Sequence, residues 1–131
     1  MTAIDRIRAS KAFKNYTDAY DATNPRIALK IEHTYHVAEA CETVAREQGW
    51  SSDDIDLAWL CGLLHDMGRF EQLRRWDTFK DAESMSHAAL GVEVLFGENP
   101  ADAPAATSIR DFIDGPVEDE LIRARIAYHS D

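Results

Sequence analysis

The residues best suited to chemistry are His65 and Asp66, neighbours at the end of an apolar stretch that begins at Trp59. A neutral imidazole nitrogen suits Mn, Fe, Co, Ni or Zn, and a carboxylate has two oxygens with which it can bridge two ions. A histidine beside an aspartate is otherwise costly to bury, because each polar group then needs a partner inside the protein. The pair therefore indicates a metal site.

The chain contains five histidines, and each falls on a predicted helix or at its edge: His33, His36, His65, His87 and His129. His33 shares a helix face with Val37, so we expect it to point toward the core. His36 is expected at the surface or among the residues that surround the ligands. A single histidine on an apolar helix is more often a hydrogen-bonded core residue than a ligand. Spacing and composition alone thus leave the metal site a hypothesis.

The length and charge of the chain limit the classes of protein it can belong to. Its 131 residues suffice for one domain, which we assign to 1–131. Fourteen basic and 24 acidic side chains give a net charge of −10, which repels nucleic acids and anionic membrane surfaces. No apolar run approaches the roughly 20 residues of a membrane span, and charged residues interrupt the N-terminal segment as they would not in a signal peptide. We expect a cytoplasmic protein with no nucleic-acid or membrane partner.

The elements that must position these residues are helices, because apolar residues recur at intervals of three and four and convincing two-residue alternation is lacking. We predict helices over 4–20, 26–48, 51 or 52 to 66 or 67, 86–96, 105–113 and 116–128. The third is apolar nearly all round, as expected of a central helix, and Gly68 is predicted to end it. Residues 69–83 are predicted to form a loop or short helix over the site. The predicted class is an all-α bundle of five to six helices, with Cys41 and Cys61 as free core thiols.

Two segments resemble motifs of the HD superfamily of metal-dependent phosphohydrolases. Residues 33–38 (HTYHVA) resemble the first motif of that superfamily, and residues 62–69 (GLLHDMGR) resemble the signature from which it takes its name. Residue type, order, helical context and spacing agree over the first two-thirds of the chain. The resemblance implies an HD-type fold with one or two divalent ions, of Mn, Fe, Co, Ni, Zn or Mg.

The resemblance also implies which side chains hold the ions. His33, His65 and Asp66 would hold the first ion, and Asp66 would bridge to a second ion in members that contain two. His87 and His129 would be the further ligands of that second ion.

One carboxylate of the superfamily pattern has no clear counterpart here. The superfamily completes its first metal site with an aspartate on a helix well after the last histidine, whereas this sequence stops two residues after His129. Asp131 is too close to His129, and Asp111 and Asp114 come too early in the chain. The sequence therefore leaves open which carboxylate closes the site, and whether the chain is a fragment that lacks its C-terminal helices.

The resemblance implies hydrolysis of a phosphoester or phosphoanhydride, with a nucleotide as the expected substrate, by metal-activated water. Asp66 and Arg69 are the candidate catalytic residues. Lys30, Arg69 and Gln72 are candidates for contact with the substrate. An ordinary surface cation is an equally good interpretation of Arg69 and a better one of Lys30. A homodimer is left open.

Two other functions fit the same residues. A helical module could keep the histidine ligands, bind a metal ion or a nucleotide, and serve regulation without catalysis. A diiron oxygenase on the same scaffold is the third alternative. Phosphate release, ligand binding without turnover and oxygen consumption distinguish the three.

Overall fold

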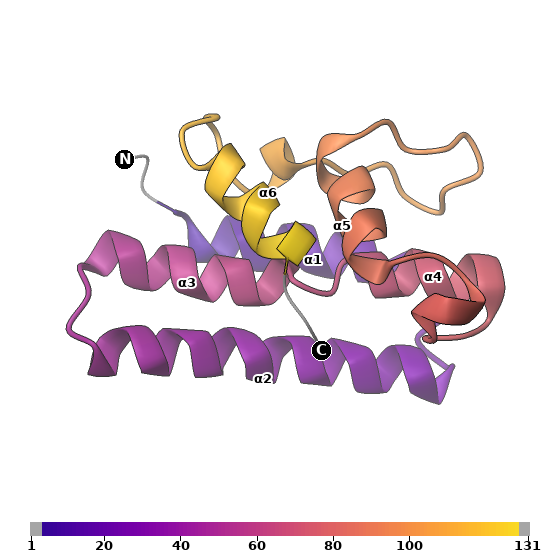
Figure 1. Cartoon of the computed structure of the whole chain (residues 1–131), viewed down its shortest axis with the longest axis horizontal. Coiled ribbons are helices and arrows are strands. Elements are labelled where there is room, and N and C mark those ends of the chain that lie inside the picture. Colours follow the sequence, from indigo (N-terminus) through magenta and orange to yellow (C-terminus); the bar gives the residue numbers. More distant parts are fainter. Residues whose placement is uncertain (1–3, 129–131) are drawn as a thin grey trace.

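The computed structural model describes residues 4–128, and within that range six α-helices and two short 3-10 helices account for the regular structure (Figure 1). They are α1 (Arg6–Asp18), α2 (Pro25–Glu47), α3 (Ser52–Leu64), α4 (Gly68–Trp76), η1 (Asp81–Glu83), α5 (His87–Phe96), η2 (Ile109–Asp111) and α6 (Asp119–Tyr128). The all-α prediction is confirmed. Between residues 4 and 128, none of these helices is long and apolar enough to cross a membrane.

Several helices begin where the sequence offers a capping side chain. The Asp5 carboxylate accepts a hydrogen bond from the Arg8 backbone N–H at the start of α1. Ser51 and Ser86 accept from the third residue of α3 and α5, respectively. Each cap satisfies a backbone donor that the helix itself cannot pair. Gly49 follows α2 with a φ of 73°, a left-handed conformation that glycine adopts without steric cost.

The prediction that Gly68 ends the third helix was wrong. α3 ends at Leu64, residues 65–67 form a turn, and Gly68 is the first residue of α4. A Cβ atom at Gly68 would lie 2.1 Å from the His87 carbonyl oxygen and 2.5 Å from the Gly91 nitrogen. This glycine is therefore required by the contact between α4 and α5, whereas the sequence suggested a helix terminus.

Other predicted boundaries also need correction. The segment predicted as a loop or short helix contains α4 and then η1, which are separated by a turn at Asp77. The helix predicted over 105–113 is reduced to the 3-10 turn η2, and the last helix begins at Asp119, three residues later than predicted. Pro104 directly precedes the first of these predicted helices, and Gly115 and Pro116 stand at the start of the second. Such residues favour turns over continuous helix.

α3 is the central helix of the bundle. It packs antiparallel along α2 and also contacts α1 and α6, while α5 packs between α4 and α6 (Figure 1). The side chains of α3 are buried on most sides, as its apolar sequence predicted. Gly62 makes the contact with α2 close, because a Cβ atom there would lie 2.8 Å from the Ala38 Cα.

Aromatic rings join α1 to α4 in the core. The Phe70 ring centroid lies 5.8 Å from that of Tyr16 and 5.7 Å from that of Tyr20. The Tyr20 hydroxyl donates a 2.5 Å hydrogen bond to the buried Glu71 carboxylate, which also accepts from Arg74 at 2.7 Å. The first turns of α4 are thereby held against α1, and α4 follows directly on the turn that contains His65 and Asp66.

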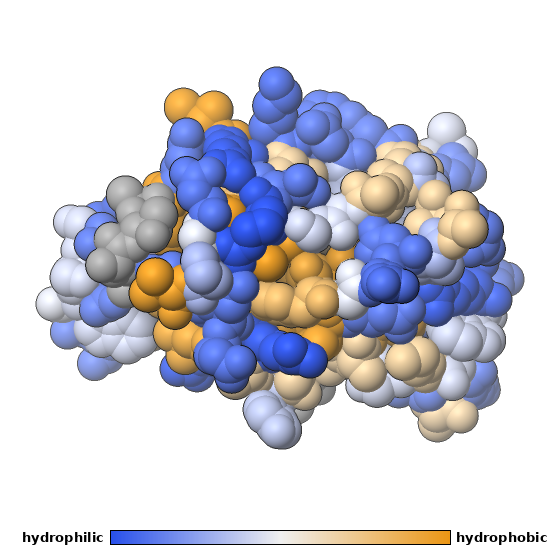
Figure 2. All heavy atoms as spheres, turned by 90° about the horizontal axis from the view of Figure 1, so that it is seen from above, coloured by the Kyte–Doolittle hydropathy of each residue, from blue (hydrophilic) through white to orange (hydrophobic). Residues whose placement is uncertain are grey.

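The face of the molecule that is seen from above is mainly polar. Seen from above, hydrophilic residues cover most of the molecule and surround a smaller hydrophobic area near the centre of this face (Figure 2). Cys41 and Cys61 are free thiols, but both are only partly buried, because they line a groove of about 650 Å³ between α2, α3 and α6. The prediction that both thiols are free is confirmed. The prediction that they lie in the core was wrong, because they lie at its edge.

Candidate metal centre

Three segments bring the candidate ligands together. α2 carries His33, the turn between α3 and α4 carries His65 and Asp66, and His87 is the first residue of α5. His65 and Asp66 lie just after the end of α3, where a turn replaces the regular helix. Neighbours on a regular helix point about 100° apart, so the turn frees this pair from that divergence.

Two glycines set the distances between these segments. Gly62, one turn before Asp66, allows α2 to approach α3 until the backbones touch at Ala38. Gly68, two residues after Asp66, allows the start of α4 to touch the backbone of α5 at His87. His33 and His87 are thus placed by separate helix contacts on either side of the same turn.

Asp66 is the centre of the cluster, and its side chain is completely buried. Its Oδ2 atom lies 3.1 Å from His65 Nε2 and 3.7 Å from His33 Nε2. Its Oδ1 atom lies 3.7 Å from His87 Nε2. His33, His65 and Asp66 each offer one ligand atom, and these atoms lie within 4.8 Å of one another. The structure therefore brings together three of the predicted ligands, with a fourth beside them.

The hydrogen bond of His65 indicates what can lie between these atoms. Its Nδ1 is 2.6 Å from the Gly62 carbonyl oxygen, which can only accept, so Nδ1 is the nitrogen that carries the proton. In the neutral ring Nε2 then has a lone pair, and this lone pair faces an oxygen of Asp66 at 3.1 Å. Two acceptors at this distance suit a cation that both can bind. The donor set therefore fits a divalent metal ion.

His87 has the same arrangement through a carboxylate that the sequence analysis missed. The Nδ1 atom of His87 lies 2.8 Å from Asp81 Oδ2, so the other nitrogen faces Asp66. Burial alone would raise the pKa of Asp81, but hydrogen bonds from His87 and Gln72 lower it below the ordinary value. Asp81 belongs to η1 and lies six residues before His87. This spacing does not correspond to a contact between neighbouring turns of a helix. No sequence signal would have identified Asp81.

The candidate substrate residues differ in what they contact. Lys30 Nζ lies 3.3 Å from Asp66 Oδ2 and 5.4 Å from the centre of the Phe79 ring. Arg69 Nε lies 4.0 Å from Asp66 Oδ1, but its NH1 group donates to the Phe79 carbonyl oxygen at 2.6 Å and to Gln72 Oε1 at 2.9 Å. Gln72 is fully buried. Lys30 thus lies at the edge of the cluster, whereas Arg69 and Gln72 hold the segment that leads to α5.

The remaining predicted residues are placed as follows. His36 is exposed on α2, as expected. His33 was expected to point toward the core, but 49% of its side chain is exposed, so that expectation was wrong. His129 and Asp131 lie outside the described residues. Asp111 accepts hydrogen bonds from Thr107 and Ser108, and Asp114 forms an ion pair with Arg8. Within 4–128, the ligand group around His33 and His65 includes Asp66 as its carboxylate and no second one.

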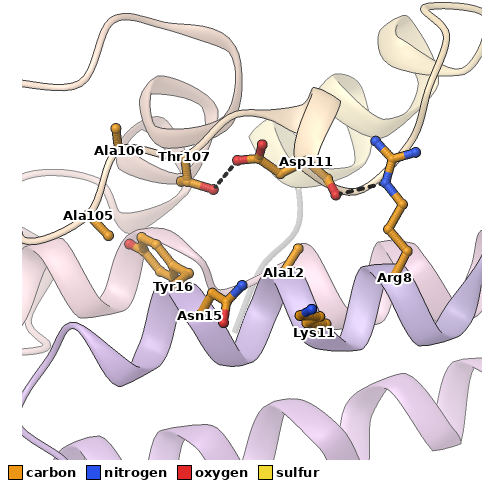
Figure 3. Close-up of a pocket in the computed structure, with 9 residues that line it drawn as sticks. All are labelled: Arg8, Lys11, Ala12, Asn15, Tyr16, Ala105, Ala106, Thr107 and Asp111. Atoms are coloured by element: carbon orange, nitrogen blue, oxygen red, sulfur yellow. Dashed lines mark hydrogen bonds between the residues drawn. The ribbon is translucent and has the colours of Figure 1, made fainter.

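A separate hollow of about 420 Å³ lies between α1 and residues 105–111. The labelled side chains of Figure 3 line it, and there the Arg8 guanidinium and the Thr107 hydroxyl both bond to Asp111. None of the candidate metal ligands is among its lining residues. This hollow is therefore distinct from the histidine cluster.

Comparison with known proteins agrees with this geometry. The model of the HD domain family matches residues 31–131, a span that includes every candidate metal ligand. A search of curated proteins and a search of solved structures each gave no match. The match covers well over half of the sequence and coincides with an all-α fold built around a His-His-Asp cluster. The chain belongs to the HD domain family, within the superfamily of metal-dependent phosphohydrolases.

Proposed function

We propose that the protein is a phosphohydrolase that cleaves a phosphoester or phosphoanhydride of a small molecule, with a nucleotide as the expected substrate. One observation carries the proposal: a completely buried carboxylate, Asp66, has three imidazole Nε2 atoms within 3.7 Å of its two oxygens. Membership of the HD domain family supports the same activity. In this proposal His33, His65, Asp66 and His87 hold divalent metal ions, and His129 joins them.

Divalent ions bound at this cluster would activate a water molecule for attack on phosphorus and offset the charge of the departing oxygen. The protein contributes by fixing the positions of the ligands. Asp66 offers one oxygen toward His33 and His65 and the other toward His87. A carboxylate with both oxygens so placed is suited to bridge two ions.

Lys30 is the side chain best placed to meet a phosphate. Its ammonium group is 3.3 Å from Asp66 Oδ2, and 18% of the side chain is exposed. From this position it can bind an oxygen of a phosphoryl group next to Asp66 as a point charge. Arg69 is more enclosed and is bonded to the Phe79 carbonyl oxygen. We therefore assign substrate contact to Lys30 and support of the site to Arg69.

The activity is tested by phosphate release from a panel of nucleoside phosphates and p-nitrophenyl phosphate, with and without added Mn²⁺. We expect release that requires the ion and that disappears in His65→Ala and Asp66→Ala. His36→Ala is the matched control, because His36 lies in the same motif as His33 and on the same helix but is not in the ligand group around Asp66. Unchanged release in both site variants would show that the cluster does not catalyse the reaction.

A non-catalytic binding module is the second candidate. It is favoured by the single carboxylate in the ligand group, as far as residues 4–128 are concerned. Thermal stabilisation by Mn²⁺ or by a nucleotide, without phosphate release from any member of the panel, would support it. Oxygen consumption after loading with iron would point instead to the diiron alternative.

A further inference from the structure

Both oxygens of Asp81 approach His87 Nδ1, Oδ1 at 3.1 Å and Oδ2 at 2.8 Å, and Oδ1 has further donors. Oδ1 accepts from Gln72 Nε2 at 2.9 Å and from Arg69 NH1 at 3.3 Å. Oδ2 is the oxygen nearest to His87 Nδ1, at 2.8 Å. An amide N–H and a guanidinium can only donate. The atom at the Oδ1 position must therefore be a hydrogen-bond acceptor, whichever atom occupies the Oδ2 position.

The orientation of Gln72 is fixed as well. Its side chain is fully buried, and its Oε1 accepts from Arg69 NH1 at 2.9 Å. If the amide were reversed, an NH₂ group would face a guanidinium that has no acceptor. Gln72 Nε2 must then point the other way, where it donates to Asp81 Oδ1 and to Ser84 Oγ, each at 2.9 Å. Arg69 thus determines the direction of hydrogen bonding from Gln72 to Asp81.

We propose that Asp81 is a positioning residue that holds His87 in the tautomer able to bind a metal ion. The carboxylate accepts the Nδ1 proton of His87, so the lone pair of the ring is on Nε2, the atom that lies 3.7 Å from Asp66 Oδ1. A carboxylate on the second nitrogen of a ligand histidine fixes both the tautomer and the ring orientation. The inference rests on the proposed metal centre, but it concerns the proton of His87 and is measurable without metal.

The substitution Asp81→Asn is the sharpest perturbation. The amide oxygen has to take the Oδ1 position, because Gln72 and Arg69 can only donate there. The NH₂ group then takes the Oδ2 position, which is the nearer one to His87 Nδ1 at 2.8 Å. Two N–H donors repel one another at this distance, so we expect Nδ1 to accept and the ring proton to move to Nε2. The lone pair is thereby removed from the side of Asp66, although Asn has nearly the shape of Asp. The proposal therefore predicts that Asp81→Asn weakens metal binding at least as much as Asp81→Ala does. A purely structural role for Asp81 predicts that Asp81→Asn is the milder change, because Asn preserves more of the packing and hydrogen bonding than Ala does.

The tautomer is measured first, by long-range ¹H–¹⁵N correlation spectra of the metal-free protein at about pH 8, well above the ordinary imidazole pKa. His87→Gln identifies the signals. We expect the proton on Nδ1 in the unsubstituted protein and on Nε2 in Asp81→Asn. Retention of the Nδ1 proton in Asp81→Asn would overturn the inference.

Mn²⁺ binding is then measured by calorimetry on the unsubstituted chain and on the two Asp81 variants. We expect an affinity loss of about 10–100-fold for the ion bound by His87, and a loss in Asp81→Asn at least as large as in Asp81→Ala. Glu83→Gln is the control, since Glu83 lies on the same 3-10 helix and pairs at 3.9 Å with the exposed Lys80.

The outcomes separate the two proposals. If Asp81→Asn binds Mn²⁺ like Glu83→Gln, the role of Asp81 is refuted while the metal centre stands. If the unsubstituted chain binds no Mn²⁺, the proposed metal centre is refuted, and the tautomer spectra alone decide whether Asp81 directs the proton of His87.

Discussion

Replacement of Gly68 by alanine should separate α4 from α5 and thereby move His87 away from Asp66. The new Cβ atom would lie 2.1 Å from the His87 carbonyl oxygen and 2.5 Å from the Gly91 nitrogen. Carbon and oxygen approach one another to roughly 3.3–3.6 Å in folded proteins. The two helices must therefore move apart by about 1 Å, because both obstructing atoms belong to the backbone.

The expected cost follows from this displacement. Overpacking of a tight contact costs about 1–3 kcal/mol, and we expect the upper end here because no flexible side chain can give way. A destabilisation of about 3 kcal/mol corresponds to a fall in Tm of about 10 °C for a domain of this size. The His87 Nε2–Asp66 Oδ1 distance of 3.7 Å would change as well, whereas metal coordination tolerates only about 0.2 Å. Affinity for Mn²⁺ should fall at least about 10-fold.

Thermal unfolding followed by circular dichroism and calorimetry with Mn²⁺ measure the two effects. Gly49→Ala is the matched control, because Gly49 has a φ of 73° and no atom within 4 Å of the added Cβ. It should lose about 1–2 kcal/mol through backbone strain and keep its Mn²⁺ affinity. A Gly68→Ala protein that melts and binds Mn²⁺ like the unsubstituted chain would refute the account of the α4–α5 contact.

Further predictions concern the other helix contact, a buried ion pair and a thiol. Gly62→Ala places a Cβ atom 2.8 Å from the Ala38 Cα, so α2 should shift with His33, and Mn²⁺ affinity measured by calorimetry should fall while His36→Ala leaves it unchanged. Burial would raise the pKa of Glu71, but hydrogen bonds from Arg74 and Tyr20 lower it below its ordinary value. A lowered folded-state pKa stabilises the fold above the unfolded-state pKa of about 4.3, and this contribution is lost as the pH falls through the folded-state pKa. In urea unfolding, Glu71→Gln should be less stable than the unsubstituted chain by roughly 3–5 kcal/mol at about pH 7. It should also lose less stability than the unsubstituted chain on acidification to about pH 3, and equal losses would contradict this. Burial raises the pKa of the Cys61 thiol to about 11. Iodoacetamide at about pH 8 should therefore label Cys61 about 100-fold more slowly in the folded than in the urea-unfolded chain. Mass spectrometry measures the two labelling rates, and equal rates would contradict the prediction.

The helices were predictable because their signals are local. Asp5, Asn24, Ser51 and Ser86 cap helices where a short polar side chain precedes an apolar period. Gly68 misled the prediction because a glycine after an apolar run has two explanations, a helix terminus or a close backbone contact. Only the position of α5, which follows later in the chain, decides between them.

The clustering of the candidate ligands was predictable from the sequence, but the residues that support the cluster were not. His33, His65 and Asp66 belong to motifs that can be read in the sequence, and the structure places their ligand atoms within 4.8 Å of one another. Asp81 and the direction of Gln72 depend on how α4, η1 and α5 fold back on each other, which no spacing reveals. The sequence suggested contact of Arg69 with the substrate, whereas only the structure shows that its NH1 group bonds to the Phe79 carbonyl oxygen.

The two glycines on either side of Asp66 give the centre a modular construction. Gly62 sets the distance from α2, and Gly68 sets the distance from α5, so each half of the ligand set is adjusted by its own helix pair. A substitution at one of these glycines would shift the histidine on that side and leave the other histidine in place. Asp66 belongs to both halves and has no such freedom.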